Sequence, residues 1–125
     1  MARFALLEHT DAPDDPAGRH FDLLLEAGGA CRTWRLLQLP AVGGGAVAAV
    51  EIPPHRTAWL DHVAGPVSGG RGFARRTDAG DYDVLASDAA EVAAASLLVL
   101  DLRGGTVRGR LRITAVDSGW AVILD

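Results

Sequence analysis

Residues 20–38 read HFDLLLEAGGACRTWRLLQ, and this stretch decides the fold. Residues 20–26 and 31–38 are rich in apolar side chains, and the Ala-Gly-Gly sequence at 27–29 between them is typical of a hairpin turn. The stretch therefore predicts two antiparallel strands. It also raises a question, because His20 and Asp22 lie two residues apart and a strand points both to one face. Buried there, they cost free energy unless a metal or each other holds them.

Further strand patterns lie on both sides of this hairpin. Upstream, residues 3–8 (RFALLE) predict a strand, and the acidic, turn-rich residues 10–18 (TDAPDDPAG) predict a loop. Downstream, residues 46–52 (AVAAVEI) are ambiguous between a strand and a helical turn, but their valines favour a strand that Pro53-Pro54 ends. Three more strands are expected near the C-terminus, at 97–104, 106–116 and 119–125.

The remaining segments are less regular. Residues 73–85 (FARRTDAGDYDVL) predict two short strands around a DAGD turn, and residues 56–63 predict one helical turn or irregular structure. Residues 87–95 (SDAAEVAAA) predict a helix, which Ser87 can cap. Many short strands between Gly and Pro turns are typical of sandwiches and barrels. We expect a mainly β fold, a compact closed or partly open β-barrel with one or two short helices, over residues 1–125 as a single domain.

The composition limits the classes of function. The 125 residues are 49% hydrophobic, enough for one core, and no window approaches the 18 apolar residues of a membrane span. No secretion signal is recognisable, and the single Cys31 fits a reducing cytoplasm as a small buried residue. The net charge of −4 argues against a broad nucleic-acid coat. All 12 basic residues are arginine, which suits phosphate recognition but also results from a GC-rich genome.

Histidines and one aspartate predict a metal site. His9 ends the first strand and His20 begins the second, so a hairpin places them at the same end, with Asp22 on the face of His20. Two imidazoles and a carboxylate form a three-ligand site with open positions for water and substrate. The spacing alone is a weak signal, because a chance pair of surface histidines near a loop explains it as well.

Other candidate residues carry weaker signals. His55 follows the rigid Pro53-Pro54 and is presented at a strand end. His62, in an irregular segment, is expected to be a solvated histidine. Residues 65–72 (GPVSGGRG) have the composition of a phosphate-binding loop, but they lack the G-x-x-x-x-G-K-[ST] pattern and precede no helix. The useful group of this loop is Arg71, among glycines.

Several motifs in order resemble a known family. They are Glu8-His9, the HFDLLLE sequence at 20–26, Thr33-Trp34, His55, the GPVSGGRG loop at 65–72, and DAGDY at 78–82. Together they resemble the N-terminal 3′-phosphoesterase domain of bacterial DNA ligase D, and more closely its small standalone relatives. The resemblance covers roughly residues 3–83.

The resemblance implies a β-barrel with an active site on one flank. Enzymes of this family depend on manganese and trim nucleic-acid 3′ ends, removing a terminal ribonucleoside and then the 3′-phosphate. By this resemblance His9, His20 and Asp22 are metal ligands and part of the catalytic set, and His55 is the catalytic histidine that contacts the scissile phosphate. Such a metal polarises a phosphoryl oxygen, while an imidazole stabilises charge or protonates the leaving oxygen.

The chain departs from the family pattern at several positions. The loop between the two metal histidines is longer than in the family, and its aspartates, Asp11, Asp14 and Asp15, either repel a nucleic-acid backbone or assist a metal. Leu24 stands where the family has a phosphate-binding arginine. Three further departures are Trp59 for a tyrosine, Leu7 for a glutamine and Pro53 for an acid, and two of these, Leu7 and Pro53, favour phosphodiesterase over phosphomonoesterase activity. We expect Arg35 or Arg71 to replace the missing guanidinium.

Three functions remain open from the sequence. The first is a metal-dependent 3′-phosphoesterase of DNA repair, with Mn²⁺ as the expected cofactor and Zn²⁺ as an alternative. Its partners are nucleic-acid 3′ ends and a DNA ligase or polymerase acting in trans, with no membrane. The second is a non-catalytic, metal-containing module that binds nucleic-acid ends. The third is a small-molecule metalloenzyme on a similar barrel.

Overall fold

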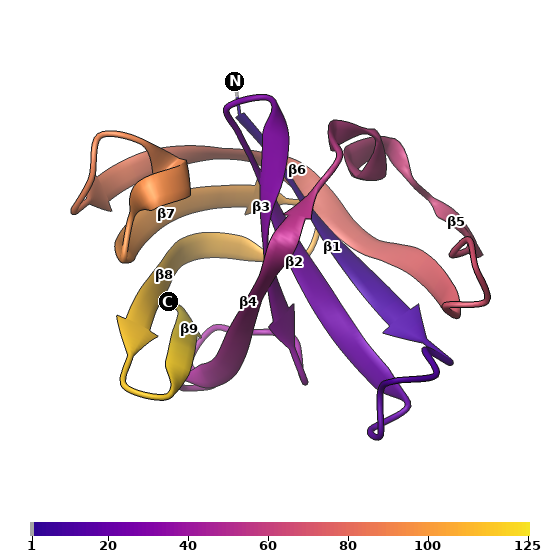
Figure 1. Cartoon of the computed structure of the whole chain (residues 1–125). Helices are drawn as coiled ribbons and strands as arrows, with labels where there is room; N and C mark the ends of the chain where they lie inside the picture. The colour runs from indigo at the N-terminus through magenta and orange to yellow at the C-terminus, as the bar shows by residue number, and fades with distance from the viewer. Residues whose placement is uncertain (1) are drawn as a thin grey trace.

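The computed structural model describes residues 2–125, and nine strands in this range form one antiparallel sheet (Figure 1). The strands are β1 (Ala2–Thr10), β2 (Arg19–Ala27), β3 (Ala30–Leu36), β4 (Val47–His55), β5 (Ala64–Pro66), β6 (Phe73–Ser87), β7 (Leu97–Gly104), β8 (Arg108–Val116) and β9 (Gly119–Leu124). Their order is β1-β2-β3-β4-β9-β8-β7-β6-β5, and β1 also pairs with β6. This second pairing closes eight strands into a barrel and leaves β5 outside.

The interior of the barrel is the main hydrophobic core. In β2 the side chains of Phe21, Leu23 and Leu25 belong to this core, as does the fully buried Trp34 of β3. Because side chains alternate along a strand, His20, Asp22 and Leu24 point to the outside of the barrel. The residues that need a partner, His20 and Asp22, therefore lie on the outer wall of the barrel.

A short connection covers this part of the outer wall. It runs from β4 through the 3-10 helix η1 (Thr57–Asp61) to β5, and it stands beside the barrel in Figure 1. Leu60 of η1 packs on a second, smaller hydrophobic cluster that includes Leu7, Leu24 and Cys31. Cys31 is buried as expected, and burial raises the pKa of its thiol to about 11. It is therefore a packing residue and not a nucleophile at neutral pH.

The expected hairpin is confirmed. β2 and β3 are joined by Gly28 and Gly29, whose φ angles of 62° and 86° are the positive values that a type I′ turn requires. The strands expected at 3–8, 46–52, 97–104, 106–116 and 119–125 are also present, with ends that differ by a few residues. The mainly β, barrel-shaped fold is therefore confirmed.

Two expected chain breaks are wrong. Residues 73–87 form one continuous strand, β6, instead of two strands around a DAGD turn, because β1 and β7 pair with its two edges. Gly80 permits this, since a Cβ there would clash with the carbonyl oxygen of Arg103. Pro53 and Pro54 do not end β4, which continues to His55. β9 pairs with β4 only over Val47–Ala49, so the prolines face an edge without a partner strand among residues 2–125.

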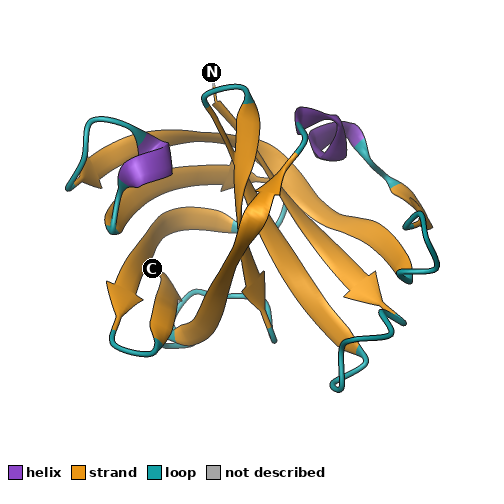
Figure 2. Ribbon diagram, in the orientation of Figure 1, coloured by secondary structure: helices purple, strands orange, loops and turns teal. Residues whose placement is uncertain are grey.

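The prediction of a helix at 87–95 is also wrong. Helical structure within residues 2–125 is limited to the 3-10 turns η1 and η2 (Val92–Ala94), which are coloured purple in Figure 2. The carbonyl oxygens of Val92 and Ala95 accept hydrogen bonds from the buried guanidinium of Arg32, each at 2.7 Å. The Asp88 carboxylate accepts hydrogen bonds from the backbone N–H groups of Ser96 and Leu97. These tertiary contacts replace the hydrogen bonds of a helix.

Asp78 fastens the turn between β7 and β8. Its carboxylate accepts hydrogen bonds from the backbone N–H groups of Ala79, Gly105, Thr106 and Val107, at 2.6–3.0 Å. Burial raises the pKa of Asp78, but the four hydrogen bonds lower it by more than burial raises it, so the net pKa is below 3.8. We predict that Asp78→Ala lowers the free energy of unfolding by about 2–4 kcal/mol at pH 7, measured by urea denaturation.

The pH dependence gives a second readout of the Asp78 contacts. Since the folded-state pKa is lowered, the contribution of Asp78 is present above about pH 4 and is lost as the pH falls through the folded-state value. The difference in the free energy of unfolding between wild type and Asp78→Ala should therefore become smaller in acid. Asp117→Ala, at an exposed aspartate of the β8–β9 turn, is the control and should stay within about 0.5 kcal/mol. A gap that does not change with pH would contradict this account.

Candidate metal centre

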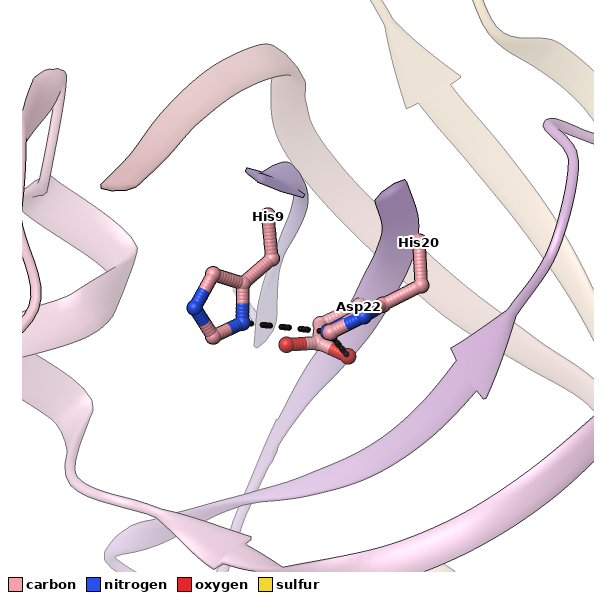
Figure 3. A group of neighbouring side chains, drawn as sticks. All are labelled: His9, His20 and Asp22. Atoms are coloured by element: carbon pink, nitrogen blue, oxygen red, sulfur yellow. Dashed lines mark hydrogen bonds and ion pairs between the residues drawn. The ribbon is translucent and has the colours of Figure 1, made fainter. Parts of the chain in front are cut away.

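The structure brings His9, His20 and Asp22 together on the outer wall of the barrel. His9 of β1 and His20 of β2 are direct cross-strand partners, and Asp22 is two residues farther along β2. Figure 3 shows the two imidazole rings turned toward each other, with the Asp22 carboxylate beside them. His9 Nδ1 lies 3.0 Å from His20 Nε2, and His20 Nε2 lies 3.6 Å from Asp22 Oδ1. The three side chains therefore lie close together, as the sequence predicted.

The site is largely shielded from water. His20 is 0% exposed and Asp22 is 4% exposed, while His9 is half-buried. Asp22 Oδ1 is buried and has no hydrogen-bond partner among residues 2–125. The nearest cationic groups, His20 Nε2 and Arg35 Nε, lie 3.6 Å and 3.7 Å from this oxygen, beyond hydrogen-bond distance, so a metal ion would satisfy it more closely.

In each ring, the nitrogen that does not face the other imidazole donates a hydrogen bond. His9 Nε2 lies 2.6 Å from the carbonyl oxygen of Arg71, and His20 Nδ1 lies 2.8 Å from Asp15 Oδ2. A carbonyl or an ionised carboxylate can only accept, so the ring nitrogens carry the protons in these two bonds. In the neutral rings His9 Nδ1 and His20 Nε2 then present lone pairs to each other. Two facing lone pairs repel, so a proton or a metal ion must lie between them.

The donor set fits a metal ion. Each of the three residues offers one ligand atom, and these atoms lie within 4.8 Å of one another. The 3.0 Å between His9 Nδ1 and His20 Nε2 is short enough for one ion to reach both nitrogens. The cluster of His9, His20 and Asp22 could therefore bind a metal.

Carboxylates set the protonation of His20. Burial lowers the pKa of His20, but the neighbouring carboxylates of Asp22 and Asp15 together raise it more, so the net pKa lies above 6.5. The same hydrogen bond to His20 lowers the pKa of Asp15 below 3.8. Without a metal, a proton held by His20 is thus the natural occupant of the space between the rings, and a metal would displace it.

A glycine loop supports His9 from outside. Residues 67–72 form a loop closed by a hydrogen bond from the Val67 N–H to the Gly72 carbonyl oxygen. Gly72 has a φ of 93°, and a Cβ there would clash with the Thr10 carbonyl oxygen, so only glycine fits. This close approach brings the Arg71 carbonyl oxygen to His9. The GPVSGGRG loop thus orients a metal ligand through its backbone.

The metal cluster borders a pocket of about 710 Å³ that also contains the other expected residues. His9, Asp22, His55, Arg35 and Arg71 all line it. Arg35 is the cross-strand partner of Asp22, and its Nε lies 3.7 Å from Asp22 Oδ1. The Arg71 side chain folds back to donate hydrogen bonds to the carbonyl oxygen and Oγ of Ser68. The guanidinium groups of Arg35 and Arg71 and the imidazole of His55 thus line the same pocket as the cluster.

The departures from the family pattern have structural consequences. Leu24 is 0% exposed and packs in the cluster under Leu60, so the place of the expected arginine is filled by apolar side chains. Trp59 and Pro53 line the pocket. His62 does not line this pocket, but its ring packs against Trp59 with the centroids 4.7 Å apart, and its Nε2 is 2.9 Å from the Ala74 carbonyl oxygen. It is partly buried and not fully solvated as expected.

Asp15 is the site residue that the sequence did not single out. It lies in the loop between β1 and β2 and was expected, with Asp11 and Asp14, either to repel a backbone or to assist a metal. Its Oδ2 accepts the His20 hydrogen bond, and its Oδ1 accepts one from the Ala17 N–H. The loop between β1 and β2 therefore folds one of its carboxylates under a candidate metal ligand, which is the usual support of a metal-binding histidine.

We predict that Asp15→Ala lowers the affinity for Mn²⁺ by about 10- to 100-fold, because His20 loses the group that fixes its tautomer and orientation. Isothermal titration calorimetry at pH 7.5 measures the change. Asp14→Ala is the matched control, since Asp14 is exposed in the same loop and makes no hydrogen bond to His20. Equal losses in the two variants would indicate a general charge effect instead of a specific support.

Comparisons with known proteins assign no family to the chain. No protein-family profile matches the sequence, and no curated protein is significantly similar to it. Within residues 2–125, no helix has the length and apolar character needed to cross a bilayer.

Proposed function

We propose that this protein is a metal-dependent phosphoesterase that trims nucleic-acid 3′ ends. One observation carries the proposal: a cluster able to hold a metal borders the same pocket as a histidine and three arginines, Arg35, Arg56 and Arg71. A divalent ion with arginines around it is the arrangement that binds and activates a phosphate ester. The sequence motifs at 8–9, 20–26, 65–72 and 78–82 supply the more specific choice of 3′ ends, through their resemblance to the ligase D phosphoesterase domain.

Each side chain has a role that follows from its position. Arg35 and Arg71 bind the non-bridging phosphate oxygens, for which Arg71 exchanges its bonds to Ser68 for bonds to the substrate. His55 protonates the leaving oxygen or stabilises the developing charge. The metal, when bound, supplies a polarised phosphoryl oxygen and a water of lowered pKa. Asp15 and the Arg71 carbonyl oxygen keep the inner nitrogens of His20 and His9 free to act as ligands.

Manganese is the proposed metal. Two imidazoles and one carboxylate suit Mn, Fe and Zn. The resemblance of the motifs to a manganese-dependent family selects Mn²⁺ among these metals, and Zn²⁺ is the second candidate.

The charge distribution favours recognition of an end over recognition of a long backbone. The net charge is −4, and the exposed Asp14 lines the pocket beside the arginines. A nucleic acid bound along its length would meet this negative charge, whereas a single terminal phosphate reaches Arg35 and Arg71. We further propose phosphodiester over phosphomonoester cleavage, and a role in DNA repair with a ligase or polymerase in trans.

A module that binds ends without cleaving them is the second candidate. The observation that favours it is Leu24, which is buried under Leu60 and leaves β2 without a phosphate-binding arginine. In this case the metal and the remaining arginines hold an end that another enzyme processes.

One assay separates these functions. Purified protein is incubated with Mn²⁺ and a primer-template whose primer ends in a single 3′-ribonucleotide, and the products are resolved on a sequencing gel. Shortening by one nucleoside that requires His55 and Mn²⁺ supports the esterase. Metal-dependent retention of the uncleaved DNA supports the binding module. If neither occurs, the proposal is wrong and a small-molecule substrate becomes the better hypothesis.

Arg35→Ala and Arg71→Ala test the arginine roles in the same assay. Unaltered affinity for inorganic phosphate in both variants would show that the missing guanidinium is not replaced. Arg56→Ala is a suitable comparison, because Arg56 is exposed at the rim of the same pocket and has no partner carboxylate among residues 2–125.

A further inference from the structure

The pocket beside the metal cluster has an apolar wall that phosphate chemistry does not use. Ile52, Pro53, Pro54, Trp59 and Val67 line it together with the charged groups. These residues come from the end of β4, from η1 and from the loop after β5. Phosphate and metal are bound by charged and polar groups. We therefore expect the ligand to have an apolar part that contacts this wall.

The apolar wall is placed close to the reacting groups. The ring of Trp59 lies 6.1 Å from that of His55 in an edge-to-face arrangement, so the residue proposed to protonate the leaving group sits directly beside the tryptophan. Trp59 is only half-buried although it packs against the cluster that includes Leu60. Pro53 and Pro54 are exposed on an unpaired edge of β4 and give the wall a rigid shape.

The volume fits a small ligand. About 710 Å³ lies within the roughly 300–1,000 Å³ that is usual for pockets of small molecules and cofactors. A ligand that matches the whole pocket is anionic at one end, where Arg35, Arg71 and the metal ligands lie, and planar and apolar at the other. A nucleoside phosphate has this composition.

We infer that the pocket binds one terminal nucleotide as a unit, with its base against Trp59 and Pro53-Pro54 and its phosphate at the metal and the arginines. This inference rests on the proposed function and adds a base subsite to it. Recognition by stacking depends on the face of a base and not on its hydrogen-bonding edge, so all four bases are accepted similarly. The terminal nucleoside is then held while its phosphoester is cleaved.

The experiment compares a ligand with and without its base. Adenosine 5′-phosphate, ribose 5-phosphate and inorganic phosphate are titrated into the Mn²⁺-loaded protein by calorimetry. Wild type should bind adenosine 5′-phosphate roughly tenfold more tightly than ribose 5-phosphate, as base stacking on an aromatic side chain provides. Trp59→Leu should reduce this ratio to less than about threefold and leave the affinity for inorganic phosphate unchanged, and Trp59→Phe should retain most of the ratio.

Controls separate stacking from misfolding. Thermal unfolding of each variant checks the fold. The ratio of the two affinities in wild type tests the base subsite without any substitution, so misfolding cannot affect it. Leu85→Ala, at an exposed apolar residue of β6 outside the pocket, should leave every affinity unchanged. Equal metal-dependent binding of adenosine 5′-phosphate and ribose 5-phosphate by wild type would overturn the base subsite and leave the phosphoesterase intact. Absence of phosphate binding in all three titrations would overturn both.

Discussion

Replacing His20 with alanine is expected to lower the affinity for Mn²⁺ by more than about 100-fold and to remove detectable cleavage of a 3′-ribonucleotide end. Loss of a supporting group outside the metal already costs about 10- to 100-fold, and loss of a ligand should cost more. His20 is also the member of the cluster that lies closest to both others, since His9 Nδ1 and Asp22 Oδ1 are 3.0 Å and 3.6 Å from its Nε2. Calorimetry measures the affinity and a sequencing gel measures the cleavage.

A thermal shift distinguishes loss of the metal from loss of the fold in this variant. A ligand that binds only the folded state raises the melting temperature, so Mn²⁺ should stabilise wild type and not His20→Ala. His62→Ala is the matched histidine control, because His62 lies outside the metal pocket and should keep the Mn²⁺ shift. An equal Mn²⁺ shift in wild type and His20→Ala would show that the ion binds elsewhere.

Replacing Arg32 with alanine is expected to lower the free energy of unfolding by about 3–5 kcal/mol, the largest effect outside the metal centre. Arg32 is 8% exposed, and its guanidinium donates to both carboxylate oxygens of Glu51 and to the carbonyl oxygens of Val92 and Ala95. It also lies over the rings of Trp34 and Trp120, at 4.7 Å and 5.0 Å from their centroids. Its removal leaves buried acceptors without donors and a cavity beside two tryptophans.

Guanidinium denaturation followed by tryptophan fluorescence measures this loss directly, because Trp34 and Trp120 are in contact with the site of substitution. Arg110→Ala is the control, since Arg110 is exposed on β8 and has no partner carboxylate among residues 2–125. It should change the free energy of unfolding by less than about 0.5 kcal/mol. A loss below about 1 kcal/mol for Arg32→Ala would mean that the 87–95 segment does not depend on this guanidinium.

The sequence predicted the local parts of the fold and missed the parts that depend on distant contacts. The β2–β3 hairpin follows from two apolar runs around a Gly-Gly turn, so local rules were enough. The 87–95 segment has helix-forming residues and a capping serine, but Arg32, about 60 residues earlier, takes its carbonyl oxygens. No local pattern reports such a contact. Closure of the barrel by β1 and β6 is non-local in the same way.

The candidate site shows the same division. His9 and His20 could be paired from the sequence because one loop joins their strands, and the cross-strand register agrees. Arg35 or Arg71 was expected to replace the missing guanidinium, and both line the pocket. Asp15 could not be chosen from three aspartates of one loop, because the choice depends on how the loop folds onto His20. The acidic, lengthened loop was the available signal.

The central claim is that His9, His20 and Asp22 bind a metal, and equilibrium dialysis against Mn²⁺ tests it most directly. Wild type at pH 7.5 should bind about one ion per chain, and His9→Ala and Asp22→Ala should each bind almost none at the same free concentration while remaining folded by circular dichroism. If both folded variants bind as much Mn²⁺ as wild type, these residues are not the ligands and the account is wrong.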